Sequence, residues 1–252
     1  MSSEEAAKDS CIVRHFNYYA PVSDQDRRLL IQLEDNATPV RAGIHLWDER
    51  DQAHDFCTLK RGWAFSYRNL ENGTRQILDI YLPGDIIGLR EFAFSQRLAG
   101  VQMVEDGEVC FFPHRNLTNI FRCSYSLTSI LFAIASRQQV MLTERLVNLA
   151  RRNAREKLAH FLLEMFQRLR QTQGSGKESF RLPLSQEVLA DLLGLSPVHV
   201  SRTFTALGDD GLVIRDRHSI TLPDLEALKE EAGFDDRYLI ENMRPLFDGS
   251  SA

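Results

Sequence analysis

One helix face near the end of the chain carries the side chains whose chemistry is easiest to interpret. Between Ser196 and Leu207, the face opposite the apolar stripe presents Val198, Ser201, Arg202 and Thr205, with His199 at its flank. A solvated face usually carries Lys and Glu, whereas small polar residues around one arginine suit insertion into the major groove of double-stranded DNA. Arg202 can donate two hydrogen bonds to O6 and N7 of guanine, a pairing that discriminates between bases by roughly 1–3 kcal/mol.

The other polar residues of this segment can add contacts or fix its position on a duplex. Val198 can touch a thymine methyl group, and Ser201 can bond to a base edge or a phosphate. His199 can do the same, although a solvated surface histidine is nearly as good an interpretation. Phosphate contacts are expected from two helix N-termini, where free N–H groups and the helix dipole favour an anion. The residues at these N-termini are Ser185, Gln186 and Ser196.

Two short helices and a hairpin must position that face. Ser185 can cap the first helix, and Gly194 suits the sharp turn that ends it. Ser196 can cap the second helix, with Pro197 at its first position. The residues expected to be buried are Val188, Leu189, Leu192 and Leu193 on the first helix and Val200, Phe204 and Leu207 on the second. After Gly211 two short β-rich pieces predict a wing, with Arg215, Arg217 and His218 as its polar residues. The order of these elements predicts a winged helix-turn-helix.

Two longer helices precede this segment. Residues 124–152 contain no proline or glycine, and apolar residues recur at helical spacing: Leu127, Ile130, Leu131, Ile134 and Met141. A helix of this length, about 40 Å, either packs along its own domain or pairs with a second copy of the chain, and the periodicity leaves both interpretations open. A second helix is expected from Asn153 to Gln171, followed by a linker, QTQGSGKESF, at residues 171–180.

The region from Phe16 to about Arg122 has the short alternations of a compact β domain. Trp63, Phe65 and Tyr67 alternate, and Asn72-Gly73 then offers a hairpin turn. The run EVCFFPHRNLTNIF, residues 108–121, predicts a buried strand followed by a short helix.

Composition and charge limit the class of protein. The 252 residues are 43% hydrophobic and 26% charged, as in an ordinary globular chain. The net charge is −5, yet residues 145–222 carry 12 Lys and Arg against 8 Asp and Glu. This locally basic segment is the one expected to bind nucleic acid. No apolar run approaches the length of a membrane span, so we expect a cytoplasmic protein without a membrane partner. The four cysteines, Cys11, Cys57, Cys110 and Cys123, are scattered and predict reduced thiols.

The chain resembles the Crp/Fnr family of transcription regulators over nearly its whole length. LENGTRQILDIYLPGDIIGL is similar to the hairpin and Gly-Asp-x-x-Gly turn of the family, and SQEVLADLLGLSPVHVSRTFTAL to its helix-turn-helix. ITLPDLEALKEEAGFD is similar to the tail of FixK-like members. The resemblance implies an α+β fold with a cyclic-nucleotide-binding-like β-roll, a long dimerisation helix and a winged helix-turn-helix. The expected divisions are a flexible N-terminus at 1–15, the β-roll at 16–123, the dimerisation helix at 124–152, the winged helix-turn-helix at 153–222 and an extension at 223–252.

The family resemblance also implies partners. A homodimer would place two recognition helices in successive major grooves of a pseudo-palindromic promoter site, with the long helix as the dimer seam. Members of the family also bend DNA and contact RNA polymerase. The resemblance therefore implies that this regulator contacts RNA polymerase at the promoter, as an activator or as a repressor.

This chain departs from the family at the residues that bind the small-molecule signal in other members. Members that bind cyclic AMP carry Glu directly after the second glycine of the turn and an Arg-Ser pair further on, whereas this chain has Leu89 after Gly88 and Leu98 after Arg97. Glu91 could substitute only if the turn were remodelled, and Arg97 alone could still meet an anion. The residues of this candidate effector pocket are Gly84, Gly88, Leu89, Arg97 and Leu98. We expect no cyclic AMP binding.

Other cofactors of the family fit the sequence no better. Oxygen-sensing members hold an iron-sulfur cluster with closely spaced N-terminal cysteines, but only Cys11 lies near this N-terminus. Haem is not expected, because the available histidines are isolated in a β domain: His15, His45, His54 and His114. Redox control through the thiol of Cys11 or Cys57 stays open. A sensor whose DNA binding depends on a signal is therefore the alternative. The motifs of a nucleophile elbow, a phosphate loop or a dinucleotide fold are missing, so no enzyme is expected.

Many members of the family have Glu two residues after the serine that starts the recognition helix, and this Glu reads cytosine. Val198 holds that place here, whereas Arg202 matches the arginine that the family shares. The resemblance therefore implies a half-site that keeps the arginine contact and loses the cytosine contact.

Overall fold

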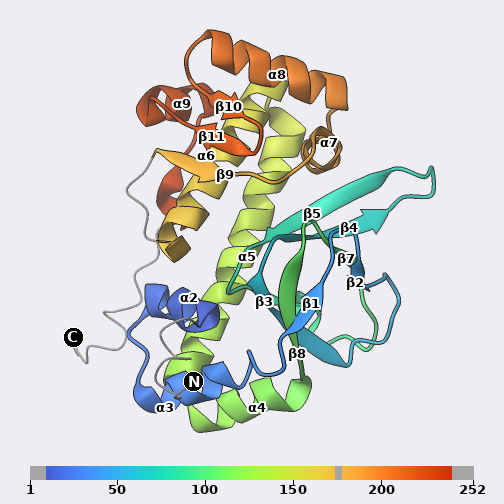
Figure 1. Cartoon of the computed structure of the whole chain (residues 1–252), viewed down its shortest axis with the longest axis vertical. Coiled ribbons are helices and arrows are strands. Elements are labelled where there is room, and N and C mark those ends of the chain that lie inside the picture. Colours follow the sequence, from blue (N-terminus) through green and yellow to red (C-terminus); the bar gives the residue numbers. More distant parts are fainter. Residues whose placement is uncertain (1–9, 174–177, 240–252) are drawn as a thin grey trace. The chain divides into compact units, whose positions relative to one another are not determined.

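The computed structural model describes residues 10–173 and 178–239. These residues form two compact units, the first made of residues 10–68 and 79–136 and the second of residues 69–78 and 137–239 (Figure 1). Part of the expected linker, residues 174–177, lies outside the described residues, as do the first nine residues and residues 240–252 of the expected C-terminal extension.

The β-roll is made of two four-stranded antiparallel sheets. One has the order β1-β8-β3-β6 and the other β2-β7-β4-β5. The strands of the first sheet are β1 (Thr38–Val40), β3 (Asp55–Arg61), β6 (Ile86–Ile87) and β8 (Gly107–Pro113). Those of the second are β2 (His45–Trp47), β4 (Ala64–Asn69), β5 (Arg75–Tyr81) and β7 (Gly100–Met103). The predicted turn joins β4 to β5, and Gly73 has a φ of +82°, a conformation that favours glycine.

In the described part of the first unit, three complete helices and a short 3-10 turn accompany the sheets, and α5 (Tyr125–Arg151) begins there as well. The complete elements are α2 (Cys11–Tyr19), α3 (Asp24–Ile31), the turn η1 (Leu89–Glu91) and α4 (His114–Cys123). The expected flexible N-terminus is wrong for residues 10–15, because Ser10 caps α2 and the side chains of Ile12, Val13 and Phe16 are at most 2% exposed. These apolar residues recur on one face of α2, which therefore packs into the hydrophobic core. The predicted strand and short helix at residues 108–121 are confirmed as β8 and α4.

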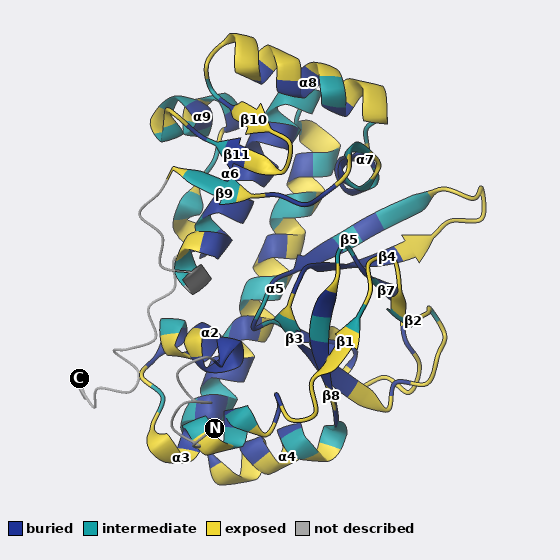
Figure 2. Cartoon of the chain, viewed as in Figure 1, coloured by how far each residue is buried: buried dark blue, intermediate teal, exposed yellow. Residues whose placement is uncertain are grey.

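Helix α5 (Tyr125–Arg151) is the long helix that the sequence predicts. The five apolar residues assigned to the dimer seam are instead buried within their own chain, with exposed fractions of at most 5%: Leu127, Ile130, Leu131, Ile134 and Met141. The first four belong to the same hydrophobic core as α2. Their assignment to a seam is therefore wrong, because the strongest apolar periodicity marks the face that packs against the chain itself. Exposed apolar residues lie on another face of α5 (Figure 2).

The second unit joins helices to a small sheet. Its helices are α6 (Ala154–Gln173), α7 (Gln186–Leu193), α8 (Pro197–Asp209) and α9 (Leu225–Ala232), followed by the 3-10 turn η2 (Asp236–Leu239). Its strands are β9 (Ser179–Arg181), β10 (Ile214–Asp216) and β11 (Ser219–Thr221), in the order β10-β11-β9. Residues 223–239 of the expected C-terminal extension pack against α6. Leu228 and Leu239 are fully buried, and the Gln171 side chain on α6 donates a hydrogen bond to the Leu239 carbonyl oxygen at 2.5 Å.

His160 on α6 lies in a buried aromatic cluster formed with this C-terminal segment. Its ring stacks on Tyr238 at 6.2 Å between centroids and meets Phe234 edge-on at 4.9 Å. Burial lowers the pKa of His160 to about 4, and Arg152 and Arg145 act in the same direction, whereas Glu164 opposes them. The folded protein therefore keeps His160 neutral at pH values where the unfolded chain protonates it.

This pKa predicts a loss of stability in mild acid. Between pH 6.5 and 4 the unfolded chain binds one proton more than the folded protein, so the free energy of unfolding falls by up to about 1.4 kcal/mol per pH unit on acidification. Urea unfolding at several pH values would measure this slope. His160→Phe keeps an aromatic ring in the cluster and is expected to have a shallower slope. An identical slope in this variant would contradict the assignment of the effect to His160.

Within residues 10–173 and 178–239, none of the helices combines the length and the apolar character needed to cross a membrane.

Candidate nucleic-acid interface

Helix α7 and the turn after it have the local structure that the sequence predicts. The Ser185 hydroxyl accepts a hydrogen bond from the Val188 amide at 3.2 Å, which caps the helix. Gly194 ends it with a φ of +62°, where a side chain would be strained. Leu189, Leu192 and Leu193 are buried as expected, and Val188 is half-buried. The turn is therefore set by local interactions, and the direction of α7 by its apolar face.

Helix α8 is capped and packed in the same way. The Ser196 hydroxyl accepts from the His199 amide at 3.2 Å, and Pro197 occupies the first turn. Val200, Phe204 and Leu207 form the buried stripe. Thr203, whose burial was not predicted from the sequence, is 8% exposed, and its hydroxyl donates to the His199 carbonyl oxygen at 2.8 Å. A threonine on the flank of an apolar stripe gives only a weak sequence signal of burial.

The opposite face of α8 is open to solvent (Figure 2). Val198 is 58% exposed, an unusual position for an apolar side chain. Of the other residues predicted for contact with DNA, Ser201 and Gln186 are half-buried and the rest are exposed: Ser185, Ser196, His199, Arg202 and Thr205. Among the residues that the structure describes, the Arg202 guanidinium makes no hydrogen bond or ion pair. This face therefore offers an unengaged arginine among small polar and apolar side chains.

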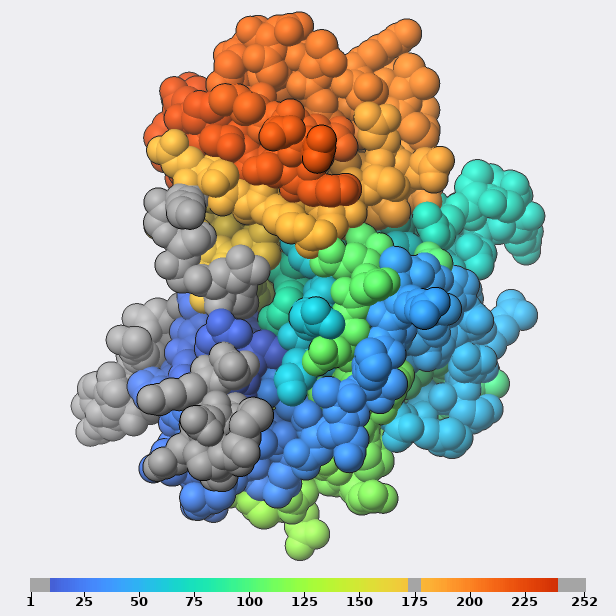
Figure 3. Space-filling model, in the orientation of Figure 1, coloured from blue at the N-terminus to red at the C-terminus, as the bar shows by residue number. Residues whose placement is uncertain are grey.

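The wing is the hairpin of β10 and β11. Arg217 takes a φ of +51° at its turn, and the exposed His218 follows. Arg215 lies on β10 as predicted and is exposed, while its guanidinium carbon lies 4.3 Å from the centre of the Phe204 ring and partial burial lowers its pKa. This stacking joins the wing to α8, and Figure 3 shows the two orange segments as neighbours on one surface of the second unit.

Arg155 near the start of α6 anchors the end of α8. Its guanidinium donates to Glu231 on α9 at 2.7 Å and forms an ion pair with Asp210, and the Glu231 hydrogen bond is the main cause of its raised pKa. This anchor was not predicted from the sequence. The three residues lie far apart in the chain, and only the fold brings them together.

The predicted effector pocket contains a buried ion pair made by the chain itself. The Arg97 side chain is 4% exposed and donates to Glu91 at 3.1 Å and to the Asp55 carbonyl oxygen. Its guanidinium also stacks on Trp47, 3.9 Å from the ring centre. The other oxygen of Glu91 accepts from the amides of Leu98 and Ala99, at 2.8 and 3.2 Å. The prediction that Arg97 is available for an anion is therefore wrong in this structure.

The other effector-pocket residues do not form one site. Gly88 lies against this ion pair, because a Cβ there would be 3.0 Å from Arg97 Nη1. Gly84 belongs elsewhere, since a Cβ there would come within 2.7 Å of the Cys11 carbonyl oxygen on α2. Leu89 is half-buried in η1, and Leu98 is 47% exposed. Gly84 is therefore required by the close approach of α2, and its place in an effector pocket is wrong.

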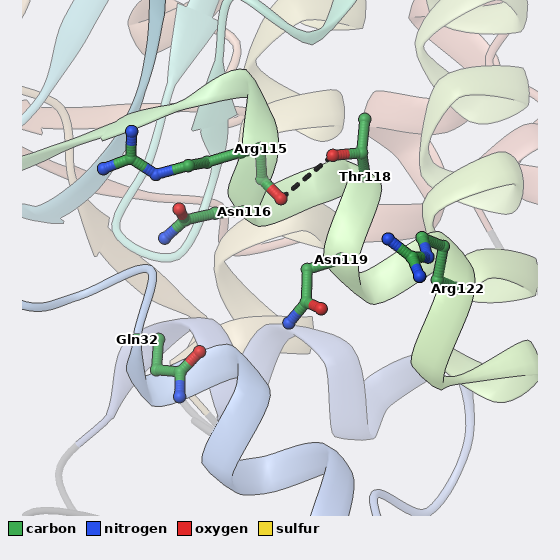
Figure 4. Close-up of a pocket in the computed structure, with 6 residues that line it drawn as sticks. All are labelled: Gln32, Arg115, Asn116, Thr118, Asn119 and Arg122. Carbon is green, nitrogen blue, oxygen red and sulfur yellow. Dashed lines mark hydrogen bonds between the residues drawn. The ribbon is translucent and has the colours of Figure 1, made fainter.

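A separate open cavity of about 370 Å³ lies along α4. Its lining residues are Gln32, Arg115, Asn116, Thr118, Asn119 and Arg122, and the Thr118 hydroxyl donates to the Arg115 carbonyl oxygen at 3.0 Å (Figure 4). None of the residues predicted for an effector lines it.

Three of the four thiols are buried. Burial raises the pKa of Cys11, Cys57 and Cys110, with Glu34 adding to the effect at Cys11. Cys123 is exposed at the end of α4. In the described part of the chain, no group of three or more His, Cys, Asp or Glu side chains has an arrangement that could hold a metal ion. The thiols considered for redox control, Cys11 and Cys57, are therefore held in their less reactive protonated form.

Comparison with known proteins agrees with this architecture. Residues 38–123 match the model of the cyclic nucleotide-binding domain, and residues 156–231 match that of the Crp-like helix-turn-helix domain. The nitrogen fixation regulation protein FixK of Rhizobium meliloti is 32% identical over 190 residues, which are 75% of this chain and 83% of that protein. The transcriptional regulatory protein btr of Bordetella pertussis is 28% identical over 236 residues, 92% of this chain and 96% of that one.

A solved structure supports the same fold. FixK2 from Bradyrhizobium japonicum superposes with a TM-score of 0.71 at 24% identity and covers 79% of this chain and 98% of its own. The β-rich N-terminal domain, the long helix and the C-terminal helix-turn-helix occur here in the expected order. The chain therefore belongs to the Crp/Fnr family of DNA-binding transcription regulators, which are not enzymes, and its identity to FixK sequences supports the FixK-like branch.

Proposed function

We propose that this regulator binds a pseudo-palindromic promoter site as a homodimer and that each protomer reads one half-site with α8. The observation that carries the proposal is the solvent face of α8, where an unengaged Arg202 stands among the small exposed side chains of a capped and packed helix-turn-helix. The N-termini of α7 and α8 would hold the flanking phosphates through Ser185, Gln186 and Ser196. The wing would add contacts from Arg217 and His218.

A stripe on α5 that is exposed except at the half-buried Thr128 and Leu149 supports the homodimer. Residues at alternating three- and four-residue spacing follow one line along the helix: Tyr125, Thr128, Phe132, Ala135, Gln139, Leu142, Leu146 and Leu149. Tyr125, Phe132 and Leu146 are 82%, 75% and 63% exposed. The stripe is about 36 Å long at 1.5 Å per residue, and its spacing is that of a two-stranded coiled coil. We assign the seam to this stripe, in place of the buried residues that the sequence analysis favoured.

If the stripe is the dimer seam, introducing charged side chains into it should dissociate the dimer. Phe132→Glu together with Leu146→Glu would place two carboxylates per protomer in an apolar seam, and the dimer dissociation constant is expected to rise at least about 100-fold. Sedimentation equilibrium would measure it. Ile44→Glu, which changes a 52% exposed side chain outside α5, is the matched control and should leave the dimer intact. A stable dimer of the double variant would overturn the seam.

We propose further that DNA binding requires no cyclic nucleotide, haem or iron-sulfur cluster. The support comes from the residues themselves: Arg97 is engaged by Glu91 and Trp47, Leu89 follows Gly88, and the four cysteines lie on α2, β3, β8 and the end of α4. The buried, protonated thiols also argue against redox control through Cys11 or Cys57. In this proposal the protein acts in the cytoplasm and contacts RNA polymerase, as its family resemblance implies.

A gel-shift titration tests the proposal directly. The purified full-length protein, without added ligand, should retard a promoter fragment that contains a dyad site and should bind a scrambled fragment of the same length and composition much more weakly. Binding that appeared only after a small molecule or an oxidant was added would overturn the ligand-independent proposal. Equal binding to both fragments would overturn sequence-specific reading.

A further inference from the structure

The segment from Asn69 to Leu78, here called the hairpin arm, belongs to the same compact unit as the helix-turn-helix. It comprises the end of β4, the turn at Asn72-Gly73 and the beginning of β5. The turn is closed by the Leu70 amide, which donates to the Thr74 carbonyl oxygen at 2.8 Å, and by the Asn72 side chain, which accepts from the Thr74 amide at 3.0 Å. The arm is therefore an ordered element beside α7 and not a loose loop.

Two neighbouring side chains of the arm contact the last turn of α7. Arg75 donates to Oδ2 of Asp191 from Nε at 2.9 Å, and its Nη2 lies 2.8 Å from the same oxygen. Both side chains are about 30% exposed, so the pair is partly shielded from solvent. Gln76 then donates from Nε2 to the carbonyl oxygen of Leu192 at 3.4 Å.

These contacts offset two unfavourable features of the C-terminal end of α7. The last carbonyl groups of a helix lack partners within it, and a carboxylate in the last turn meets the negative end of the helix dipole. Gln76 supplies a donor to one such carbonyl group, and Arg75 neutralises the carboxylate of Asp191. Helix α7 has only eight residues, so it depends on such tertiary contacts.

A third contact ties the arm to α5 and α6. Arg145 on α5 donates from Nη1 to the Leu78 carbonyl oxygen at 2.7 Å and from Nη2 to Glu164 on α6 at 2.9 Å. The side chains of Arg145 and Glu164 are 11% and 2% exposed. The arm is therefore held at its base by a buried ion pair and reaches α7 with its polar side chains.

We propose that the hairpin arm positions α7 for DNA reading and that Arg75 acts as a positioning residue through Asp191 without touching DNA. The proposal rests on the proposed function, because α7 carries Ser185 and Gln186 at the end that would meet a phosphate. By holding the C-terminal end of α7, the arm also influences where α8 begins, because the turn at Gly194 follows directly. Specific DNA binding is thus expected to depend on a residue outside the helix-turn-helix.

A charge-swap cycle in the full-length protein tests this role. Arg75→Asp and Asp191→Arg are each expected to weaken binding to the dyad fragment about three- to fivefold, and the double variant should recover most of the loss. The dependence of affinity on salt should keep its slope, because no phosphate contact is removed. Arg68→Ala, which breaks the exposed pair with Glu49 on the same hairpin, is the matched control and should bind like the wild type.

Three results would overturn the proposal: a double variant no better than the singles, a salt slope reduced by about one in Arg75→Asp, or the same loss in Arg68→Ala. Hydrogen exchange without DNA keeps the test separate from the proposed function. The Leu192 and Leu193 amides should exchange several-fold faster in Arg75→Ala than in the wild type. A wild type that bound no dyad DNA would reject the proposed function. Unchanged amide exchange in Arg75→Ala would reject the role of the arm in holding α7, whatever the result with DNA.

Discussion

Replacing Glu91 with alanine is expected to lower the free energy of unfolding by about 3–5 kcal/mol, because it leaves a buried cation without its partner. Arg97 would keep only the Asp55 carbonyl oxygen and the Trp47 ring, and the amides of Leu98 and Ala99 would lose their acceptor. Each unsatisfied buried amide adds its own desolvation cost. Urea unfolding followed by circular dichroism would measure the loss.

Two further variants separate the ion pair from other effects. Glu49→Ala breaks the exposed pair with Arg68 and should cost at most about 1 kcal/mol. The double variant Glu91→Leu with Arg97→Met removes both charges and should regain much of the stability lost in Glu91→Ala. A cost below about 1 kcal/mol for Glu91→Ala would show that the ion pair does not hold this part of the β-roll together.

Replacing Arg202 with alanine should weaken binding to the dyad site by about 10- to 100-fold per half-site and relax the preference at one base pair. The physical reason is the loss of a bidentate donor to guanine, which Lys cannot reproduce in the same geometry. Competition binding with every substitution at each half-site position would measure both the affinity and the preference.

The matched controls for Arg202 lie on the same surface. Arg217→Ala in the wing should weaken binding to all sequences about equally, because a wing arginine is expected to meet phosphate. Val198→Glu should alter the preference at another position, since a carboxylate can accept a hydrogen bond from cytosine. Unchanged base preference in Arg202→Ala would remove Arg202 as the base-reading residue, whatever the change in affinity.

The winged helix-turn-helix was predictable because its signals are local. Ser185, Gly194, Ser196 and Pro197 act on their own helix ends, and the structure contains each predicted cap and turn. The Asn72-Gly73 turn and the long helix before Arg152 were predictable for the same reason. The family resemblance then supplied the order of the domains.

Helix α5 shows where local periodicity misleads. On α5 one apolar stripe includes Leu127 and Ile134, and another includes Phe132 and Leu146, so the sequence offers two apolar faces. Only the position of the hydrophobic core shows that the first stripe is buried within the chain and the second is exposed.

By itself, the sequence determined the helix ends and turns of the winged helix-turn-helix and the solvent face that carries Arg202, because neighbours within a few residues fix these features. The family followed from motifs spread along the whole chain. The tertiary structure decided which face of α5 packs inward and that Glu91 forms an ion pair with Arg97. It also decided that Arg155 contacts the end of α8 and Arg75 the end of α7. Arg155 and Arg75 meet carboxylates that are distant in the chain, and the Glu91–Arg97 pair, although its members are six residues apart, forms only because both side chains are buried. Their pairing follows from the packing of the core, which no local pattern specifies.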